Sequence, residues 1–325
     1  MSADSDRSIR YYHYNASPYA RKIVWYLTLR GLPWAEIKQP VIMPRPDLEV
    51  IGVNYRRIPV MAIGKDVYCD TRIILRKLEE LFPDGRIGAT SPDGWAIQKL
   101  LEVWHVEGPL FSRGAGSMPL GVFSDPQFSK DREQMTGRPW NAEAMEKFRP
   151  EALTYVRSAF SFLEKLLADG RQWIISTSQP SLADIEAIFV VHWLNGMKGA
   201  LPQDLVSQAK YPKVFAWMSR FDDALQSARN KAPKPTKLDG ATSANQIFKS
   251  DFAEKEGTIE AGEPQKALRK SDQVELFPTD SGMHNKDRGR LLSLTEDEIV
   301  IGLENGLRLH TPRAGFRVRQ LGSKI

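Results

Sequence analysis

The spacing of apolar positions changes from that of a strand to that of a helix within the first thirty residues. Ile9 to Tyr14 is rich in residues typical of strands, and residues 18–30 then repeat apolar positions at helical spacing up to Gly31. The same reading predicts three further strands and two further helices, at residues 34–41, 60–63, 67–69, 47–53 and 70–82. This order of elements predicts a four-stranded mixed sheet with helices packed against it.

The strand signals stop at about Trp95, and long helical periods continue to Ala228, which predicts a bundle of helices. Residues 231–272 are rich in Lys, Pro, Ser, Asp and Glu, so we expect a partly disordered linker there. Asn305-Gly306 then lies between two apolar runs, the strongest short hairpin signal in the chain. Residues 273–325 are therefore predicted to form a small, mainly β extension that packs on the rest of the protein.

Composition and charge narrow the class of protein. Lys and Arg number 45 against 40 Asp and Glu, a formal charge of +5 without basic clusters, so nucleic-acid binding is not expected. No apolar run approaches the roughly 18 residues that span a bilayer, and the polar first ten residues argue against a signal peptide. We therefore expect a cytoplasmic protein that does not enter membranes. Cys69 is the single cysteine, so any thiol chemistry requires a thiol from another molecule.

Four short motifs stand out along the chain. They are Ser17-Pro18-Tyr19-Ala20-Arg21-Lys22, Ile58-Pro59-Val60, Asp70-Thr71, and the capping box Ser181-Leu182-Ala183-Asp184. In kind and in order they resemble the motifs of glutathione transferases. The resemblance covers about residues 9–228. It implies an α/β thioredoxin-like glutathione-binding domain at 1–88 and an all-α domain at 92–230, and some fungal members carry a C-terminal extension of this kind. The family also implies a homodimer, whose interface the extension could block or reshape.

The resemblance implies which residues bind glutathione, a tripeptide with two carboxylates, an ammonium and a thiol. Asp70 would bind the γ-glutamyl ammonium, and Thr71, at a helix N-terminus, would bind the γ-glutamyl carboxylate. The alternative is that either residue only caps that helix. Ile58 and Pro59 would turn their backbone toward the cysteinyl part, through a peptide bond that is cis in the family. Arg57 could meet the glycyl carboxylate or be a solvated surface residue, and it stays outside the predicted site.

Ser17, at the predicted start of the first helix, is the candidate catalytic residue. A thiol with a pKa of about 8.5 is only about 3% ionised near neutral pH, and lowering that pKa by two units takes about 2.7 kcal/mol. A hydrogen bond to a charged group contributes roughly 1.5 to 3 kcal/mol, and a helix N-terminus up to about 1. Ser17 could instead be a plain N-cap, and Tyr14 and Asn15 on the same loop are competing candidates.

These residues favour a glutathione transferase that joins the thiolate of glutathione to an electrophilic apolar small molecule, in secondary metabolism or detoxification. Serine stands where omega-type members have cysteine, which argues against mixed-disulfide chemistry. A glutathione-dependent cis–trans isomerase of an unsaturated substrate could use the same site. A non-catalytic protein that recruits a partner through its extension is the alternative of another class. No metal is expected.

Overall fold

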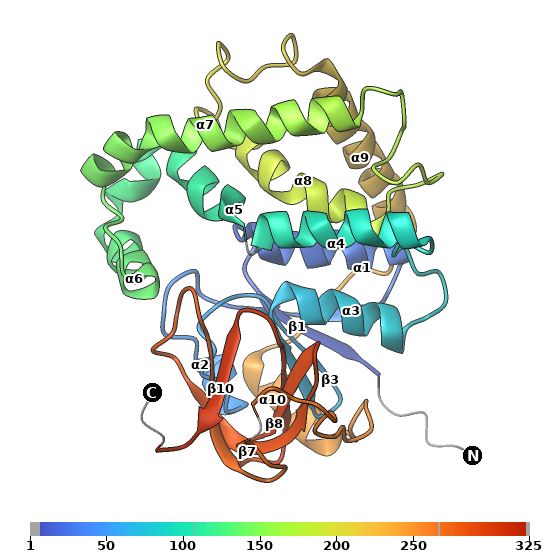
Figure 1. Ribbon diagram of the computed structural model, residues 1–325, viewed down its shortest axis with the longest axis vertical. Coiled ribbons are helices and arrows are strands. Elements are labelled where there is room, and N and C mark those ends of the chain that lie inside the picture. The colour runs from blue at the N-terminus through green and yellow to red at the C-terminus, as the bar shows by residue number, and fades with distance from the viewer. Residues whose placement is uncertain (1–6, 107, 266, 323–325) are drawn as a thin grey trace.

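The computed structural model describes residues 7–106, 108–265 and 267–322. The outer ends of the first and last predicted domains, residues 1–6 and 323–325, lie outside this description. The helical half occupies the upper part of Figure 1, and the strands of both the N-terminal domain and the C-terminal extension occupy the lower part. The predicted structural class of each part is confirmed: α/β for the first, all-α for the second and mainly β for the extension. The extension, however, joins the N-terminal domain in a way that the sequence did not predict.

The N-terminal domain has the predicted thioredoxin-like order of elements. They are β1 (Ile9–His13), α1 (Pro18–Arg30), β2 (Trp34–Lys38), α2 (Pro46–Val50), β3 (Val60–Ile63), β4 (Asp66–Cys69) and α3 (Thr71–Leu81). β1 pairs in parallel with β2 and antiparallel with β3, which pairs antiparallel with β4. α1 begins at the Ser17 cap with Pro18 in its first turn, and it ends where Gly31 adopts a left-handed conformation, with φ of 61°.

The second domain consists of helices packed around α8. Its helices are α4 (Pro92–Val106), α5 (Pro109–Gly114), α6 (Pro126–Thr136), α7 (Ala142–Leu166), α8 (Leu182–Asn195) and α9 (Pro212–Lys231). α8 is buried almost all round, and α1 packs against both α8 and α9, so the two domains share an apolar interface. The predicted capping box is confirmed, with Ser181 and Asp184 each capping the backbone of the other. None of the described helices is long and apolar enough to cross a bilayer.

The segment predicted to be a partly disordered linker is folded, which corrects that expectation. β5 (Thr236–Lys237) pairs in parallel with β2, and α10 (Gly240–Lys249) packs against α2. The hydroxyl of Tyr12 on β1 lies 2.8 Å from Oγ of Ser243, and Ile247 is fully buried. A few small or apolar residues on one face of α10 are enough to cover the sheet, although the average composition of the segment is polar.

The extension does not form a separate β unit, because its strands continue the sheet of the N-terminal domain. They are β6 (Gln273–Pro278), β7 (Asp287–Leu294), β8 (Glu298–Gly302), β9 (Arg308–Pro312) and β10 (Phe316–Gln320). β9 pairs in parallel with β4, with Val67 opposite Leu309, so the described residues form one ten-stranded sheet in the order β10-β6-β7-β8-β9-β4-β3-β1-β2-β5. β4 is buried throughout, and β9 covers an edge that would otherwise expose unpaired backbone groups.

Candidate functional site

The predicted site residues are brought together by the register of three strands. Tyr12, the residue before the last of β1, lies opposite Val60, the first residue of β3, and Val60 also lies opposite Cys69 at the end of β4. The loop that leads to Ser17, the Ile58-Pro59 segment and the turn that leads to Asp70 therefore emerge at the same end of the sheet. Residues more than fifty positions apart in the chain become neighbours in this way.

Ser17 is buried at the N-terminus of α1. Its Oγ accepts a hydrogen bond from the backbone N–H of Ala20, with an N···O distance of 3.2 Å, so the N-cap interpretation is confirmed. A cap uses an oxygen lone pair, and the hydroxyl hydrogen remains available for donation. Capping and catalysis are therefore compatible roles for Ser17.

The two competing candidates on the same loop have other partners. The side-chain oxygen of Asn15 accepts a hydrogen bond from Lys38, and Asn15 is exposed. The Tyr14 hydroxyl lies 3.5 Å from a guanidinium nitrogen of Arg132 on α6, and the Arg45 guanidinium lies 5.8 Å from the centre of the Tyr14 ring. In each of these contacts the loop residue accepts, as Ser17 does from Ala20, so Ser17, Tyr14 and Asn15 all stay candidates for the donor.

Asp70 is a buried N-cap of α3 whose charge is already balanced. Its Oδ1 accepts from the backbone N–H of Arg72 at 3.1 Å and from Nε of Arg72 at 2.9 Å, and its Oδ2 accepts from Nη2 at 3.1 Å. Burial by itself raises the pKa of Asp70, but the charge and hydrogen bonds of Arg72, helped by Arg57, lower it to about 2. Asp70 is therefore ionised and held mainly by Arg72.

Thr71 follows Asp70 in the first turn of α3 and is 2% exposed. Its Oγ1 has no hydrogen-bond partner among the residues that the structure describes. An unpaired buried hydroxyl costs roughly 1 to 3 kcal/mol, and a hydroxyl at a helix N-terminus is well suited to a carboxylate. The Thr71 hydroxyl at the helix N-terminus therefore fits the carboxylate at the γ-glutamyl end of glutathione.

The Ile58-Pro59 peptide bond is cis, as the resemblance implies, and Ile58 is buried. Its neighbour Arg57 is not a solvated surface residue, because its side chain is only 19% exposed. Nη1 of Arg57 lies 3.0 Å from Oδ1 and 2.9 Å from Oδ2 of Asp280, and Nη2 lies 3.9 Å from Oδ2 of Asp70. The expectation of a solvated surface residue is thus wrong, and Arg57 lies beside the predicted site residue Asp70.

Tyr19 connects this cluster to the helical domain. Burial raises the pKa of Tyr19, and the nearby carboxylates of Asp70 and Asp280 raise it further, against the effect of Arg57. The ring of Tyr19 contacts Phe111 with centroids 4.7 Å apart. The charged residues near Tyr19 in the first domain therefore lie beside an aromatic side chain of the second domain.

Asp280 and Arg72 contact residues of the candidate site, and the sequence did not reveal either contact. Asp280 is 223 positions from Arg57 in the chain and lies in a polar turn with no recognisable motif. Arg72 follows the Asp70-Thr71 motif directly, and only the turn geometry, with φ of 92° at Asp70, brings its guanidinium back onto that carboxylate. Of the two, only Arg72 could have been suspected from the sequence, because it directly follows the Asp70-Thr71 motif.

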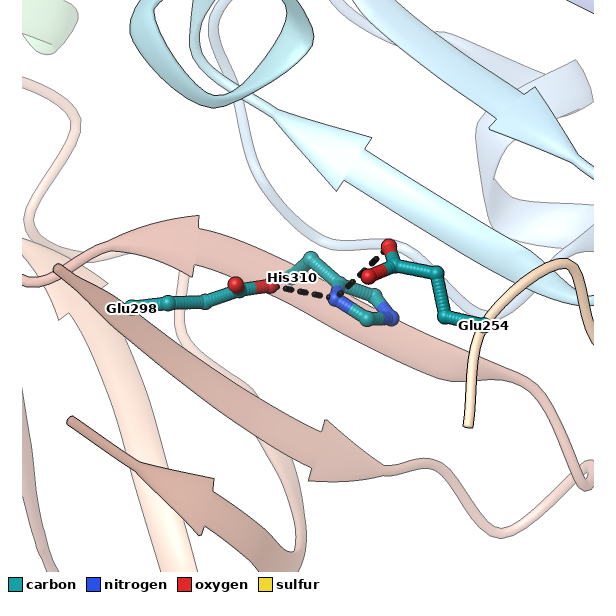
Figure 2. Close-up of side chains that lie close together, drawn as sticks. All are labelled: Glu254, Glu298 and His310. Atoms are coloured by element: carbon teal, nitrogen blue, oxygen red, sulfur yellow. Dashed lines mark hydrogen bonds and ion pairs between the residues drawn. The ribbon is translucent and has the colours of Figure 1, made fainter. Parts of the chain in front are cut away.

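A second cluster of charged residues lies where the extension joins β4. Figure 2 shows the His310 imidazole on β9 between the carboxylates of Glu254 and Glu298. Its Nδ1 lies 2.6 Å from Glu298, its Nε2 lies 2.9 Å from Asp66, and Lys77 lies 3.0 Å from Glu298. Burial lowers the pKa of His310, but hydrogen bonds to Asp66 and Glu298 raise it to about 9. The protonated imidazole donates to Glu298 through Nδ1 and to Asp66 through Nε2, so opposite charges hold the cluster together as an ion network.

Comparisons with known proteins agree with this fold. A family model described as the glutathione S-transferase N-terminal domain matches residues 12–86, and a domain of unknown function, DUF7962, matches residues 115–230. Glutathione S-transferase U1 of Arabidopsis thaliana is 17% identical over 248 residues, which cover 76% of this chain and 99% of that relative. Glutathione S-transferase U7 of the same plant is 22% identical, with 63% of this chain and 79% of the relative covered.

Among solved structures, a GST-like protein from Pseudomonas syringae is similar along almost the whole chain. The TM-score is 0.72 at 22% identity, with 97% of this chain and 99% of that chain covered. The beta-etherase LigF from Sphingobium sp. has a TM-score of 0.53 at 18% identity, with 69% of this chain and 100% of that chain covered. The likeness to the first structure thus includes the extension. The matched domain and the shared fold lead to one conclusion: the chain carries a glutathione S-transferase N-terminal domain at residues 12–86 within a glutathione S-transferase-like fold.

Proposed function

We propose that the protein is a glutathione transferase that binds glutathione in its N-terminal domain and joins it to an apolar electrophile. The observation that carries this proposal is the buried Thr71 hydroxyl, which lies at the N-terminus of α3 without a hydrogen-bond partner in the described part of the chain. A carboxylate accepts from such a hydroxyl and is favoured by the helix dipole. The match of residues 12–86 to the glutathione S-transferase N-terminal domain supports glutathione as the source of that carboxylate.

Ser17 would act on the thiol. Bound glutathione would supply a sulfur that is nucleophilic as a thiolate. The Ser17 hydroxyl can donate to this sulfur while its oxygen still accepts from Ala20, and its place at the start of α1 adds the helix dipole. Together these effects offer about 1.8 to 4 kcal/mol, a range that includes the roughly 2.7 kcal/mol required to lower a thiol pKa by two units.

The aromatic residues beside Tyr19 support an apolar second substrate. The Phe111 ring on α5 lies between Tyr19 and Trp193 on α8, with a centroid distance of 5.6 Å to Trp193. Such rings bind apolar surface without supplying reactive groups of their own. Their contribution would be to hold an electrophile, such as an α,β-unsaturated carbonyl, near the sulfur.

The two alternative functions make different predictions about glutathione. A cis–trans isomerase would regenerate glutathione during turnover, because the thiolate adds to a conjugated alkene and then leaves. A transferase would consume one glutathione for each product. A non-catalytic binding protein would need neither the Ser17 donor nor the unpaired Thr71 hydroxyl, and the presence of both favours an enzyme.

The test is a calorimetric titration of the full-length protein with glutathione and, separately, with S-methylglutathione. We expect saturable binding of both, because the carboxylate and ammonium contacts do not involve the sulfur. Turnover with an α,β-unsaturated carbonyl should then consume glutathione stoichiometrically. Absence of binding for both ligands would contradict the proposal, and regeneration of glutathione would replace the transferase by the isomerase.

A further inference from the structure

The C-terminal extension reaches the proposed glutathione site through Asp280, which lies in the loop between β6 and β7. Both carboxylate oxygens of Asp280 contact Nη1 of Arg57, at 3.0 and 2.9 Å. The same loop is fixed to α6 by a hydrogen bond of 2.8 Å from the backbone N–H of Gly282 to the carbonyl of Met135. Asp280 is thus held beside the site from two sides.

The rings of Tyr55 and Phe316 hold Arg57 in place. Phe316 is the first residue of β10, and its ring stacks on that of Tyr55 with centroids 5.9 Å apart and 27° between the planes. The Arg57 guanidinium lies 5.3 Å from the centre of the Tyr55 ring and 5.6 Å from that of Phe316. The extension therefore supplies both a carboxylate for Arg57 and part of its aromatic surroundings.

The two carboxylates beside Arg57 differ in their capacity to bind a further cation. Asp70 is buried and receives three hydrogen bonds from Arg72 alone. The Asp280 side chain is 59% exposed, and its oxygens pair with a single guanidinium nitrogen. Each carboxylate oxygen has two lone pairs, so Asp280 keeps acceptor capacity that faces solvent.

We propose that Asp280 is the carboxylate that recognises the γ-glutamyl ammonium of glutathione, a proposal that rests on the proposed glutathione binding. The ammonium and carboxylate of an α-amino acid are attached to one carbon, so their binding groups must be close together. Arg57 connects the two groups here, because its Nη1 holds Asp280 and its Nη2 lies 3.9 Å from Asp70, the residue before Thr71. The extension then completes the ligand site rather than only covering an edge of the sheet.

This role predicts selectivity among γ-glutamyl compounds. A ligand with a free ammonium gains a charge-assisted hydrogen bond to Asp280, and a ligand without the amino group cannot form it. Such a bond corresponds to about tenfold or more in affinity. The preference for a free amine should therefore depend on the extension.

The experiment is a set of calorimetric titrations with glutathione and with its deaminated analogue, in which hydrogen replaces the γ-glutamyl amine. The proteins are the full-length parent, Asp280→Asn, Asp280→Ala and the matched control Asp297→Asn. Asp297 is another exposed carboxylate of the extension, 70% exposed and 3.6 Å from Arg76 on α3. A thermal melt of each variant checks that it is folded.

We expect the parent to bind glutathione about tenfold more tightly than the deaminated analogue. Both Asp280 variants should lose this preference because their affinity for glutathione alone falls. Asp297→Asn should retain the preference. The proposal is overturned if the Asp280 variants keep the preference, if both ligands weaken equally, or if both bind more tightly. Failure of the parent to bind either ligand would overturn the proposed function as well, so the two failures are distinguishable.

Discussion

Nζ of Lys22 on α1 lies 2.5 Å from Oε2 of Glu186 on α8, and both side chains are almost completely buried between the two domains. The Phe189 ring, on the same helix as Glu186, lies 5.1 Å from the ammonium. Burial raises the pKa of Glu186, and the Lys22 ammonium opposes this effect by stabilising the carboxylate. The pair therefore places opposite charges at an otherwise apolar interface, where each depends on the other.

Substitution of Lys22 by Met should destabilise the protein strongly, because it leaves the Glu186 charge buried without a partner. The expected loss is about 3 to 5 kcal/mol in the free energy of unfolding, measured by urea denaturation at neutral pH. The control is Lys147→Met on α7, where Lys147 and Glu143 are 74% and 79% exposed and the expected loss is below about 0.5 kcal/mol. Equal losses for the two variants would contradict the importance of this pair.

The ion network around His310 predicts a loss of stability at alkaline pH. The pKa of His310 in the folded state, about 9, exceeds the ordinary histidine value of about 6.5. Protonated His310 therefore stabilises the fold fully below pH ~6.5, and this contribution, of about 3 kcal/mol, disappears as the pH rises through 9. The facing groups are Asp66, Glu298, Glu254 and Lys77.

The measurement is urea denaturation between pH 6 and pH 10 for the parent and for His310→Gln. Glutamine cannot titrate, so the difference in unfolding free energy between the two proteins should shrink as the pH passes 9. Amide exchange of β9 should accelerate over the same range, because β9 carries His310 and pairs with β4. A constant difference between the proteins at all pH values would show that His310 does not titrate as described.

The substitution Thr71→Val should weaken glutathione binding without lowering the stability of the protein. Valine has nearly the same shape as threonine and removes a buried hydroxyl that lacks a partner among the described residues, so stability should be unchanged or rise by up to about 1 kcal/mol. Glutathione affinity should fall by about tenfold, because the proposed hydrogen bond to the ligand is lost. Calorimetry and thermal melting measure the two quantities.

The matched control is Thr242→Val in the first turn of α10, where the Thr242 hydroxyl donates to Asp239 at 2.8 Å. This variant should lose a little stability and keep its glutathione affinity. A loss of stability in Thr71→Val, without a change in affinity, would instead indicate that Thr71 only supports α3.

The local elements and the motif residues could be predicted from the sequence because their signals are short-range. Ser17 before Pro18 marks a helix start, Asn305-Gly306 marks a hairpin, and Ser181 with Asp184 marks a capping box. Each depends on neighbours within a few positions. The order of the four motifs also predicted the glutathione S-transferase-like fold and the end of the sheet where the candidate site residues gather.

The long-range relationships could not be predicted, because no local pattern encodes them. The pairing of Val67 with Leu309, which merges the extension with the first domain, is a choice of partner that a strand sequence does not specify. The folding of α10 depends on Ser243 and Ile247 finding a complementary surface rather than on average composition. The Arg57–Asp280 contact likewise requires the completed fold.

The central claim, that Ser17 stabilises the thiolate of bound glutathione, is tested most directly by following the ultraviolet absorbance of the thiolate during a pH titration. The parent and Ser17→Ala would both be saturated with glutathione. The account predicts a bound-thiol pKa about one to two units below the usual 8.5 in the parent and a return of at least one unit toward it in Ser17→Ala, with little change in affinity. Equal pKa values in the two proteins would contradict the claim and return the role to Tyr14, Asn15 or backbone amides.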